Sequence, residues 1–417
     1  MPARGRNRGT VMNRLLPLCL TVAQLGAAAN ALGQTAPPDN DLMLAGFATL
    51  GVARSNSDQF RYAGSEQGHG VGRQADFGLD SVLGMQLSYR INPALSATAQ
   101  ALVRRDVDGH YRPDLSWALV RARLSDDVTL RAGRFGLPGL LMTDIQDVSY
   151  AYTLMRPPVE LYSQVVIDHI DGANLAYQYM VGDNVLTTEL SAGRNRSRTL
   201  TTNGDGTIVG FQARLLLLTV TLEHGPFTLR LSHDRFYITV ADRPALIALH
   251  AGLNSTGYGP LAQQLTLHQG KRFHYDTASL QMDQGHWQLG GEYGWRRGDE
   301  PSYVPNTNAW YLMAGWRWGA LLPYYSHARL RQTGNTVNAP LPASGPLATA
   351  VRTAILQGPE QQSDTLGLRW NWRPGRSLTV QVDRVRPSAK NGLLLGPSGG
   401  GLARPVTVLG LALDVVF

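Results

Sequence analysis

The chain has 417 residues, of which 43% are hydrophobic and 17% charged, and its formal net charge at pH 7 is +7. Its length would allow two or three ordinary domains, but no stretch beyond the N-terminal region has the roughly 20 consecutive apolar residues that a membrane helix needs. Without the first 31 residues, which hold four arginines and no acid, the net charge is only +3. This modest excess argues against nucleic acid as a partner, because domains that bind it carry a strongly basic patch or stripe.

The N-terminal residues have the composition of an export signal. A region with four arginines precedes an apolar run at residues 15–29, and residues 29–31 form a small-x-small cleavage motif. We therefore predict a signal peptide over residues 1–31 and a single domain over residues 32–417. An anchor helix that stays attached is the alternative, but the apolar run is short and lacks a stop-transfer flank. Cys19, the only cysteine, lies in this signal, so the remaining chain has no disulfide and no thiolate metal site.

After a short linker, apolar and polar residues alternate with a period of two, which is typical of strands. Sixteen such segments are expected, at residues 42–54, 81–91, 94–104, 114–124, 128–135, 171–181, 184–194, 206–222, 226–238, 272–283, 286–297, 308–318, 321–332, 363–373, 376–386 and 405–417. Each is long enough for a tilted strand to cross an outer membrane, and tight turns alternate with longer loops as in bacterial barrels. A closed barrel also removes the free sheet edges that lipid does not tolerate. The sequence thus predicts an all-β fold, a sixteen-stranded antiparallel transmembrane β-barrel.

The last segment shows the pattern most clearly. Leu409, Leu411 and Leu413 share one face, whereas the opposite face carries small or polar residues such as Asp414. Phe417 at the very end could place its ring at a lipid-water boundary, where outer-membrane barrels carry an aromatic girdle. An ordinary C-terminal strand of a soluble β protein is the alternative for this segment taken alone.

Several segments resemble a known family, the Gram-negative general porins. They are GFATLGV at residues 46–52, GWRWGALLPYYSHARL at 315–330, LGLRWNWR at 366–373, SLTVQVDRVR at 377–386 and the terminal phenylalanine. The resemblance runs over the chain from residue 46 to its end. It implies a homotrimer of barrels in the outer membrane, each with its third long loop folded into the lumen as a constriction.

In this sequence the third long loop is residues 136–170, which lack clean alternation. The loop contains Asp144, Asp147, Glu160 and Asp168, with Arg156 as its basic residue. In the family, loop acids face a ladder of basic residues on the wall. Inward positions near the middle of each strand are, from spacing, Gln86, Gln100, Arg131, Glu189, Arg230, Glu292, His327, Arg329, Arg369 and Gln381. The predicted pore constriction is Arg131, Asp144, Asp147, Glu160, Arg230, His327, Arg329 and Arg369.

A sixteen-stranded barrel is wide enough for a water-filled channel. We therefore expect passive diffusion of ions and small hydrophilic solutes, with selectivity set by the loop acids and the wall arginines. The sequence indicates no catalytic residue, cofactor or metal site, and the expected partners are outer-membrane lipids and further copies of the chain. One alternative is a channel selective for anions or carboxylates, whose arginines bind the solute. A less favoured one is a barrel hydrolase, because the period of two places His233 on the face opposite Ser232 and Asp234.

Overall fold

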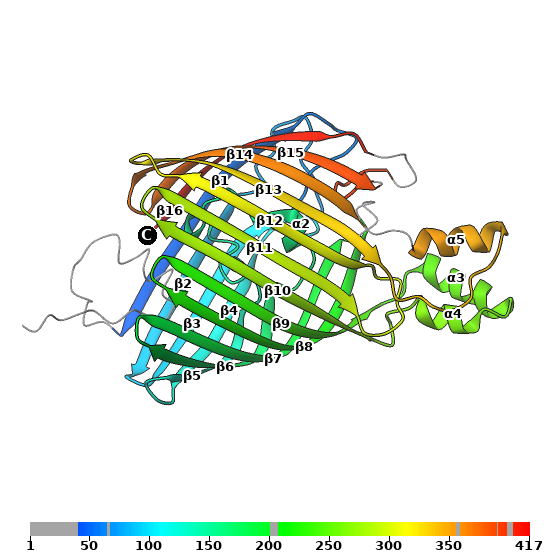
Figure 1. Ribbon diagram of the computed structural model, residues 1–417, viewed down its shortest axis with the longest axis horizontal. Helices are drawn as coiled ribbons and strands as arrows, with labels where there is room; N and C mark the ends of the chain where they lie inside the picture. Colours follow the sequence, from blue (N-terminus) through cyan, green and yellow to red (C-terminus); the bar gives the residue numbers. More distant parts are fainter. Residues whose placement is uncertain (1–40, 65–66, 201–206, 356–358, 390, 398–402) are drawn as a thin grey trace, which may run out of the picture.

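A computed structural model describes residues 41–417, apart from residues 65–66, 201–206, 356–358, 390 and 398–402. The predicted signal peptide lies outside these residues. Sixteen antiparallel strands form one closed barrel in which each strand pairs with its neighbours in sequence (Figure 1). This confirms the predicted fold class. In the described part of the chain, no helix is long and apolar enough to cross a membrane.

The strands agree with the predicted segments, although many extend further toward the long loops. They are β1 (Leu42–Ser55), β2 (Val82–Asn92), β3 (Leu95–Arg105), β4 (Tyr111–Arg123), β5 (Val128–Gly136), β6 (His169–Val181), β7 (Asn184–Leu200), β8 (Ile208–His224), β9 (Phe227–Val240), β10 (Lys271–Gln284), β11 (Trp287–Gly298), β12 (Asn306–Trp316), β13 (Leu321–Gly334), β14 (Glu360–Arg373), β15 (Arg376–Ala389) and β16 (Val406–Val416).

The barrel closes between β1 and β16. Leu50 lies opposite Leu413 in the antiparallel register. At the end of the chain Phe417 and Gly46 exchange backbone hydrogen bonds of 2.7 and 2.9 Å. A side chain at Gly46 would collide with the Phe417 ring, because a Cβ atom there would lie 2.5 Å from it. Glycine at this position therefore leaves room for the terminal ring at the closing seam.

Outward side chains form an apolar belt around the barrel. On β8, Leu216 and Leu218 point outward and are 46% and 45% exposed, whereas Leu215 and Leu217 point inward and are buried. Tryptophans occur on the outer face near the short turns; Trp287 and Trp316, for example, pack edge to face at 4.7 Å. This distribution of apolar and aromatic residues matches that of a barrel surrounded by lipid.

The short turns lie at one end of the barrel and the long loops at the other (Figure 1). Two of the long loops contain helices that stand beyond the rim: α3 (Pro244–Ser255) and α4 (Gly259–Gln264) between β9 and β10, and α5 (Gly345–Ile355) between β13 and β14. The three helices pack on one another around Leu253, Leu265 and Val351, all of which are fully buried. This helical cap was not predicted from the sequence.

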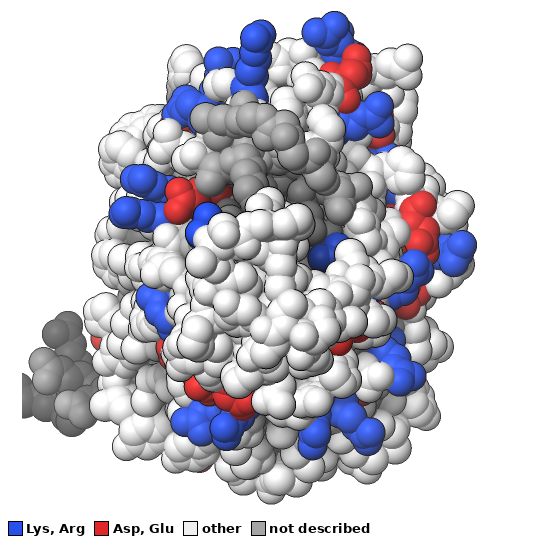
Figure 2. Space-filling model, turned by 90° about the vertical axis from the view of Figure 1, so that its right-hand side faces the viewer, with Lys and Arg blue, Asp and Glu red and all other residues white. Residues whose placement is uncertain are grey.

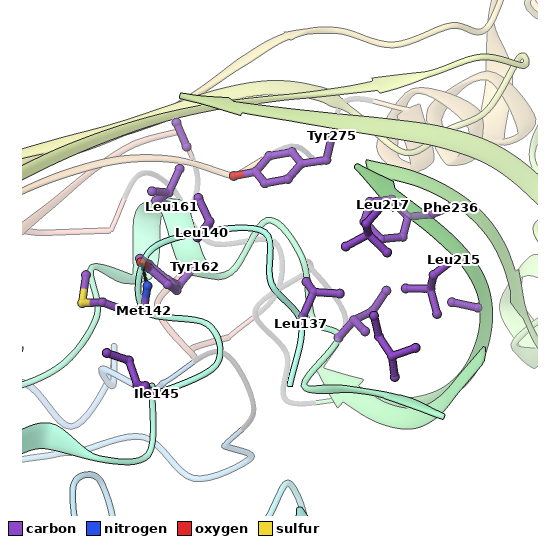
Figure 3. Packing of buried hydrophobic residues seen from close by; sticks show 14 of the residues in the cluster. Leu137, Leu140, Met142, Ile145, Leu161, Tyr162, Leu215, Leu217, Phe236 and Tyr275 are labelled. Carbon is purple, nitrogen blue, oxygen red and sulfur yellow. Dashed lines mark hydrogen bonds between the residues drawn. The ribbon is translucent and has the colours of Figure 1, made fainter. Parts of the chain in front are cut away.

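The segment between β5 and β6, residues 137–168, folds inside the barrel, and we call it the inner loop. It contains the short helices η1 (Ser149–Ala151) and α2 (Val159–Tyr162). Figure 3 shows Leu137, Leu140 and Leu161 of this loop in the same hydrophobic cluster as Leu217 and Phe236 of the wall. Because these residues exclude water on both sides, the loop is part of the core of the barrel and not a surface segment.

Candidate functional site: a narrow passage beside the inner loop

Two wall arginines hold the inner loop by its backbone. Arg230 on β9 donates from Nη1 to the carbonyl oxygen of Leu140 at 2.9 Å. Arg369 on β14 donates to the carbonyl oxygens of Ser149 and Tyr150, at 3.4 and 2.8 Å, and also to that of Tyr152. Both arginines are buried. Their guanidinium groups therefore supply charged donors to loop carbonyls inside the barrel.

The basic residue of the inner loop, Arg156, is bound by two acids. It forms a bidentate pair with Asp80, with both N–O distances at 2.8 Å, and a third bond to Asp383 on β15 at 2.5 Å. All three side chains are almost completely buried. The Arg156 guanidinium also lies 5.6 Å from the centre of the Tyr62 ring. This ion cluster joins the inner loop to the loop before β2 and to the opposite wall.

A wall carboxylate, Glu292 on β11, holds a third part of the loop. It accepts hydrogen bonds from the Tyr162 hydroxyl at 2.5 Å and from the Leu141 backbone N–H at 2.8 Å. On the wall itself it accepts from Ser279 at 2.7 Å and from Tyr311 at 3.0 Å. Four donors around one carboxylate stabilise its charge in a buried position.

Three cavities lie beside the inner loop, two of them against β3 and β4 and the third against β7 to β14. An inner vestibule of about 360 Å³ lies at the turn end and an outer vestibule of about 910 Å³ lies at the loop end, and a narrow space of about 20 Å³ shares lining residues with both. Arg104, Asp114 and Asp168 line both the narrow space and the outer vestibule, and Asp144 and Ile145 line both the narrow space and the inner one. We call this narrow space the passage. On the loop end, charged side chains lie mostly around the periphery (Figure 2).

Carboxylates dominate the lining of the passage. It contains Asp114, Asp144, Asp147 and Asp168 but only one guanidinium, that of Arg104. Arg104 on β3 lies 3.3 Å from Asp147 and 4.0 Å from Asp168. An acid of the inner loop thus faces a wall arginine here. Arg104 itself was not selected, because it lies near the end of its strand and not at the middle.

The loop acids of the passage differ in pKa. Burial raises the pKa of Asp144 to about 6, although the nearby charge of Arg230 acts in the opposite direction. Burial also raises the pKa of Asp147, again opposed by Arg104. The pKa of Asp168 is lowered, because the hydrogen bond from His169 and the charges of His169 and Arg104 outweigh the effect of burial. At neutral pH the passage is therefore negatively charged, and it loses charge on acidification.

The other predicted constriction residues lie at different places. Arg131 points inward but binds Glu189 at 2.8 Å and Asn174 at 2.9 Å, and lines none of the three cavities. Arg230 and Arg369 line the inner vestibule. Glu160 is buried in α2, where it accepts a hydrogen bond from Gln361 at 2.8 Å, and burial raises its pKa. The structure brings Asp144 and Asp147 to the passage itself.

The prediction that His327 and Arg329 point inward is wrong. On β13 every second residue from Leu322 to Leu330 is buried, so His327 and Arg329 lie on the outer face. His327 shares a 2.7 Å hydrogen bond with Asp364, which also faces outward. The alternation of polar and apolar residues does not identify the inward face of β13, because this strand has polar residues on both faces. Tyr324 turns inward because its hydroxyl reaches Gln381 at 2.7 Å and its ring covers Gly367.

We expect Arg329→Gln to leave single-channel conductance unchanged and to alter the free energy of unfolding by less than about 0.5 kcal/mol, since Arg329 is exposed on the outer face. Single-channel conductance in a planar bilayer tests this expectation. Variants of Arg369, which points inward, are measured for comparison. A marked change in the conductance of Arg329→Gln would contradict the assigned face.

The residues considered for a hydrolase do not form a catalytic triad. Ser232 and Asp234 on β9 point inward and hydrogen-bond to each other. His233 points outward and shares a 2.5 Å hydrogen bond with Asp276 of β10. Within the described residues, no group of three or more His, Cys, Asp and Glu side chains is placed to hold a metal ion.

Comparison with known proteins gives similarity in fold only. No family model and no curated protein matches the chain. Among solved structures, the anion-selective porin from Comamonas acidovorans matches with a TM-score of 0.51 and 14% identity, over 90% of this chain and 99% of that one. OprB from Pseudomonas putida matches with a TM-score of 0.53 and 10% identity, over 91% and 95%. The chain has the fold of outer-membrane porins.

A further match is OmpT, an outer membrane protein of Vibrio cholerae, with a TM-score of 0.54 and 10% identity over 92% of this chain and 100% of that one. The porin fold therefore accounts for almost the whole described chain. Similarity in fold does not assign roles to individual residues. The roles of the residues that line the passage therefore follow from their own geometry.

Proposed function

We propose that this chain is a porin of a Gram-negative outer membrane, which lets ions and small hydrophilic solutes diffuse passively through a water-filled channel, and that it is not an enzyme. The observation that carries the proposal is the series of three cavities beside the inner loop, which share lining residues from the loop end to the turn end. The apolar outer belt and the similarity in fold to OprB and to an anion-selective porin support it.

We propose further that the passage selects for cations. Four carboxylates and one guanidinium line it, and rings of carboxylates favour cations in channels. The inner-loop acids Asp144 and Asp147 are the residues that set the selectivity, with Arg104 as the wall arginine that faces them.

The alternative, a channel for anions, requires wall arginines that are available to the solute. The guanidinium of Arg131 is bound to Glu189, and those of Arg230 and Arg369 are bound to carbonyl oxygens of the inner loop. These contacts favour a structural role for the three arginines. The geometry therefore favours cations over anions as the preferred ions.

A homotrimer in contact with outer-membrane lipids remains part of the proposal. One of the similar structures is OmpT of Vibrio cholerae in a trimer form, with a TM-score of 0.53. The apolar belt supplies the surface that would contact lipid or a neighbouring copy. Cross-linking of the refolded protein in detergent, followed by gel electrophoresis, tests the oligomeric state.

Conductance of the refolded chain in a planar bilayer tests the proposed function. We expect discrete current steps in concentrated KCl, because water-filled barrels of this size conduct ions without a cycle of conformational change. The absence of steps, together with hydrolysis of a lipid or peptide ester by the purified protein, would contradict the proposal and favour a barrel hydrolase.

The cation preference is expected to fall as pH falls. Asp144 takes up a proton as the pH falls through about 6, because burial has raised its pKa to about 6. Burial also raises the pKa of Asp147, so this carboxylate is protonated at a higher pH than an exposed aspartate. The reversal potential in a KCl gradient should accordingly move toward zero on acidification. A double variant that carries both Asp144→Asn and Asp147→Asn has neither charge. Its reversal potential at high pH should already resemble that of the wild type at low pH. A preference for anions in the wild type at pH 8 would contradict this assignment.

A further inference from the structure

The wall of the inner vestibule carries a row of polar side chains at the turn end of the barrel. Glu223 on β8, Thr228 on β9 and Gln281 on β10 all line this cavity. In the antiparallel register Thr228 lies opposite Glu223 on one side and opposite Gln281 on the other. Residues that lie opposite each other on paired strands share a face of the sheet, so the three side chains stand next to one another in the lumen. We call them the polar row.

The side chains of the polar row are available to a solute. Glu223 and Thr228 are partly exposed and Gln281 is exposed. Within the described residues, no hydrogen bond or ion pair engages any of the three side chains. Beyond Gln281 the row continues with Gly290 on β11, which has no side chain to cover it. The polar row therefore offers a carboxylate, a hydroxyl and an amide with free hydrogen-bonding capacity.

The guanidinium groups of the inner vestibule are, in contrast, all engaged by the protein. Arg317 forms a bidentate pair with Asp283, with N–O distances of 3.0 and 2.9 Å. Arg230 and Arg369 donate to carbonyl oxygens of the inner loop, as described above. These contacts leave the carboxylate of Glu223 as the charged group of the wall that is open to a solute.

A cation that leaves the passage meets two carboxylates in succession. Asp144 lies where the passage meets the inner vestibule, since it lines both, and Glu223 lies in the polar row. In the described part of the chain neither carboxylate forms an ion pair with another side chain. Glu223 thus offers a second negative charge to the cations for which the passage selects.

The inner loop gives the vestibule a second side, which is largely apolar. Leu141, Met142 and Leu154 line it, together with the rings of Tyr150 and Tyr152. The cavity volume of about 360 Å³ lies at the lower end of the range for small-molecule sites and exceeds the roughly 150 Å³ that holds benzene. A polar row beside an apolar surface suits a single ring that carries polar groups along its edge.

We propose that the inner vestibule binds a hydroxylated organic ammonium ion of about the size of one sugar ring. Its ammonium group lies at Glu223, because hydrogen bonds between two charged groups are the strongest available there. Its hydroxyl groups lie at Thr228 and Gln281, whose side chains both donate and accept. The inference rests on the proposed function, since it takes the vestibule as part of the solute path, and it names the class of solute that this path favours.

Binding can be measured on the refolded chain in detergent micelles without any ion current. The probe is glucosamine at pH 7, and glucose is the analogue that has the same ring but no ammonium group. Saturation-transfer difference NMR detects such weakly bound sugars, and its intensity as a function of sugar concentration gives the affinity.

Two variants test the two kinds of contact. Glu223→Gln removes the charge and keeps the shape of the side chain, and Thr228→Val removes the hydroxyl in the same way. The matched control is Glu300→Gln, which removes an equal charge at the loop end. Glu300 pairs there with Arg272 at 2.6 Å and lines none of the three cavities. Folding of each variant is checked by the mobility of the unheated protein in gel electrophoresis.

We expect saturable binding of glucosamine to the wild type and, with the same affinity, to Glu300→Gln. In Glu223→Gln the affinity should fall roughly 10- to 100-fold, as expected for the loss of a hydrogen bond between charged groups, and in Thr228→Val roughly 2- to 10-fold. Glucose should bind the wild type about as weakly as glucosamine binds Glu223→Gln.

Three results would overturn the proposal: no saturable binding of glucosamine to the wild type, equal affinities for glucose and glucosamine, or an unchanged affinity in folded Glu223→Gln. None of them affects the conductance test in KCl. A chain that binds glucosamine as expected but shows no current steps would contradict the channel function and leave the site in place, so the two failures can be told apart.

Discussion

Replacing Arg156 by alanine is expected to lower the free energy of unfolding by about 3–5 kcal/mol, the usual cost of leaving buried charges without their partner. Arg156 makes a bidentate pair with Asp80 and a third bond to Asp383, and both carboxylates are almost fully buried. Its loss leaves two like charges close together inside the barrel. Urea unfolding of the refolded protein, followed by tryptophan fluorescence, measures this change.

The same variant should conduct better than the wild type, because the inner loop loses its attachment to the opposite wall. Arg73→Ala is the control, since Arg73 and Asp58 form an exposed pair at 3.9 Å whose contribution should be below about 1 kcal/mol. If Arg156→Ala unfolds at the same urea concentration as Arg73→Ala, the ion cluster does not hold the loop.

Replacing Arg369 by alanine is the second change with a large expected effect. It removes the donors for three carbonyl oxygens of the inner loop, those of Ser149, Tyr150 and Tyr152. Because each buried hydrogen bond from a charged group contributes about 1.5–3 kcal/mol, we expect a destabilisation of about 3 kcal/mol or more. The inner vestibule should also widen, which raises single-channel conductance.

Arg376→Ala is the control for Arg369→Ala, since Arg376 is exposed at the start of β15, next to the same strand. Conductance and urea unfolding should be the same for Arg376→Ala as for the wild type. Wild-type conductance in Arg369→Ala would show that the guanidinium does not position the loop, whatever its effect on stability.

The strands could be predicted from the sequence because apolar and polar residues alternate with a period of two along a half-buried strand. The closing strand, expected over residues 405–417, is β16 (Val406–Val416). The face of β13 could not be predicted, because that strand has a polar residue on either side at several positions. Tyr324 is inside because Gly367 and Gln381 on other strands make room for its ring and accept its hydroxyl, and pairings of this kind do not appear in one strand alone.

The partners of the inner loop were harder to predict than its position. The resemblance to porins implied that residues 136–170 fold into the barrel, but Arg230 and Arg369 bind backbone carbonyls, which any loop sequence carries. The pairing of Arg156 with Asp80 and Asp383 joins residues far apart in the chain. Such contacts follow from the closed geometry of the barrel and leave no periodic pattern in the sequence.

The most direct test of the central claim, that solutes pass between the inner loop and the β3–β4 wall, is chemical modification of single channels. A chain that starts at residue 32 has no cysteine, so one can be placed at Gln100, which lines the passage, or at Ala101, its outward neighbour on β3. A charged, water-soluble thiol reagent should reduce the current of Gln100→Cys in discrete steps and leave Ala101→Cys unchanged. Current that is unaffected after complete modification of Gln100→Cys would contradict this path.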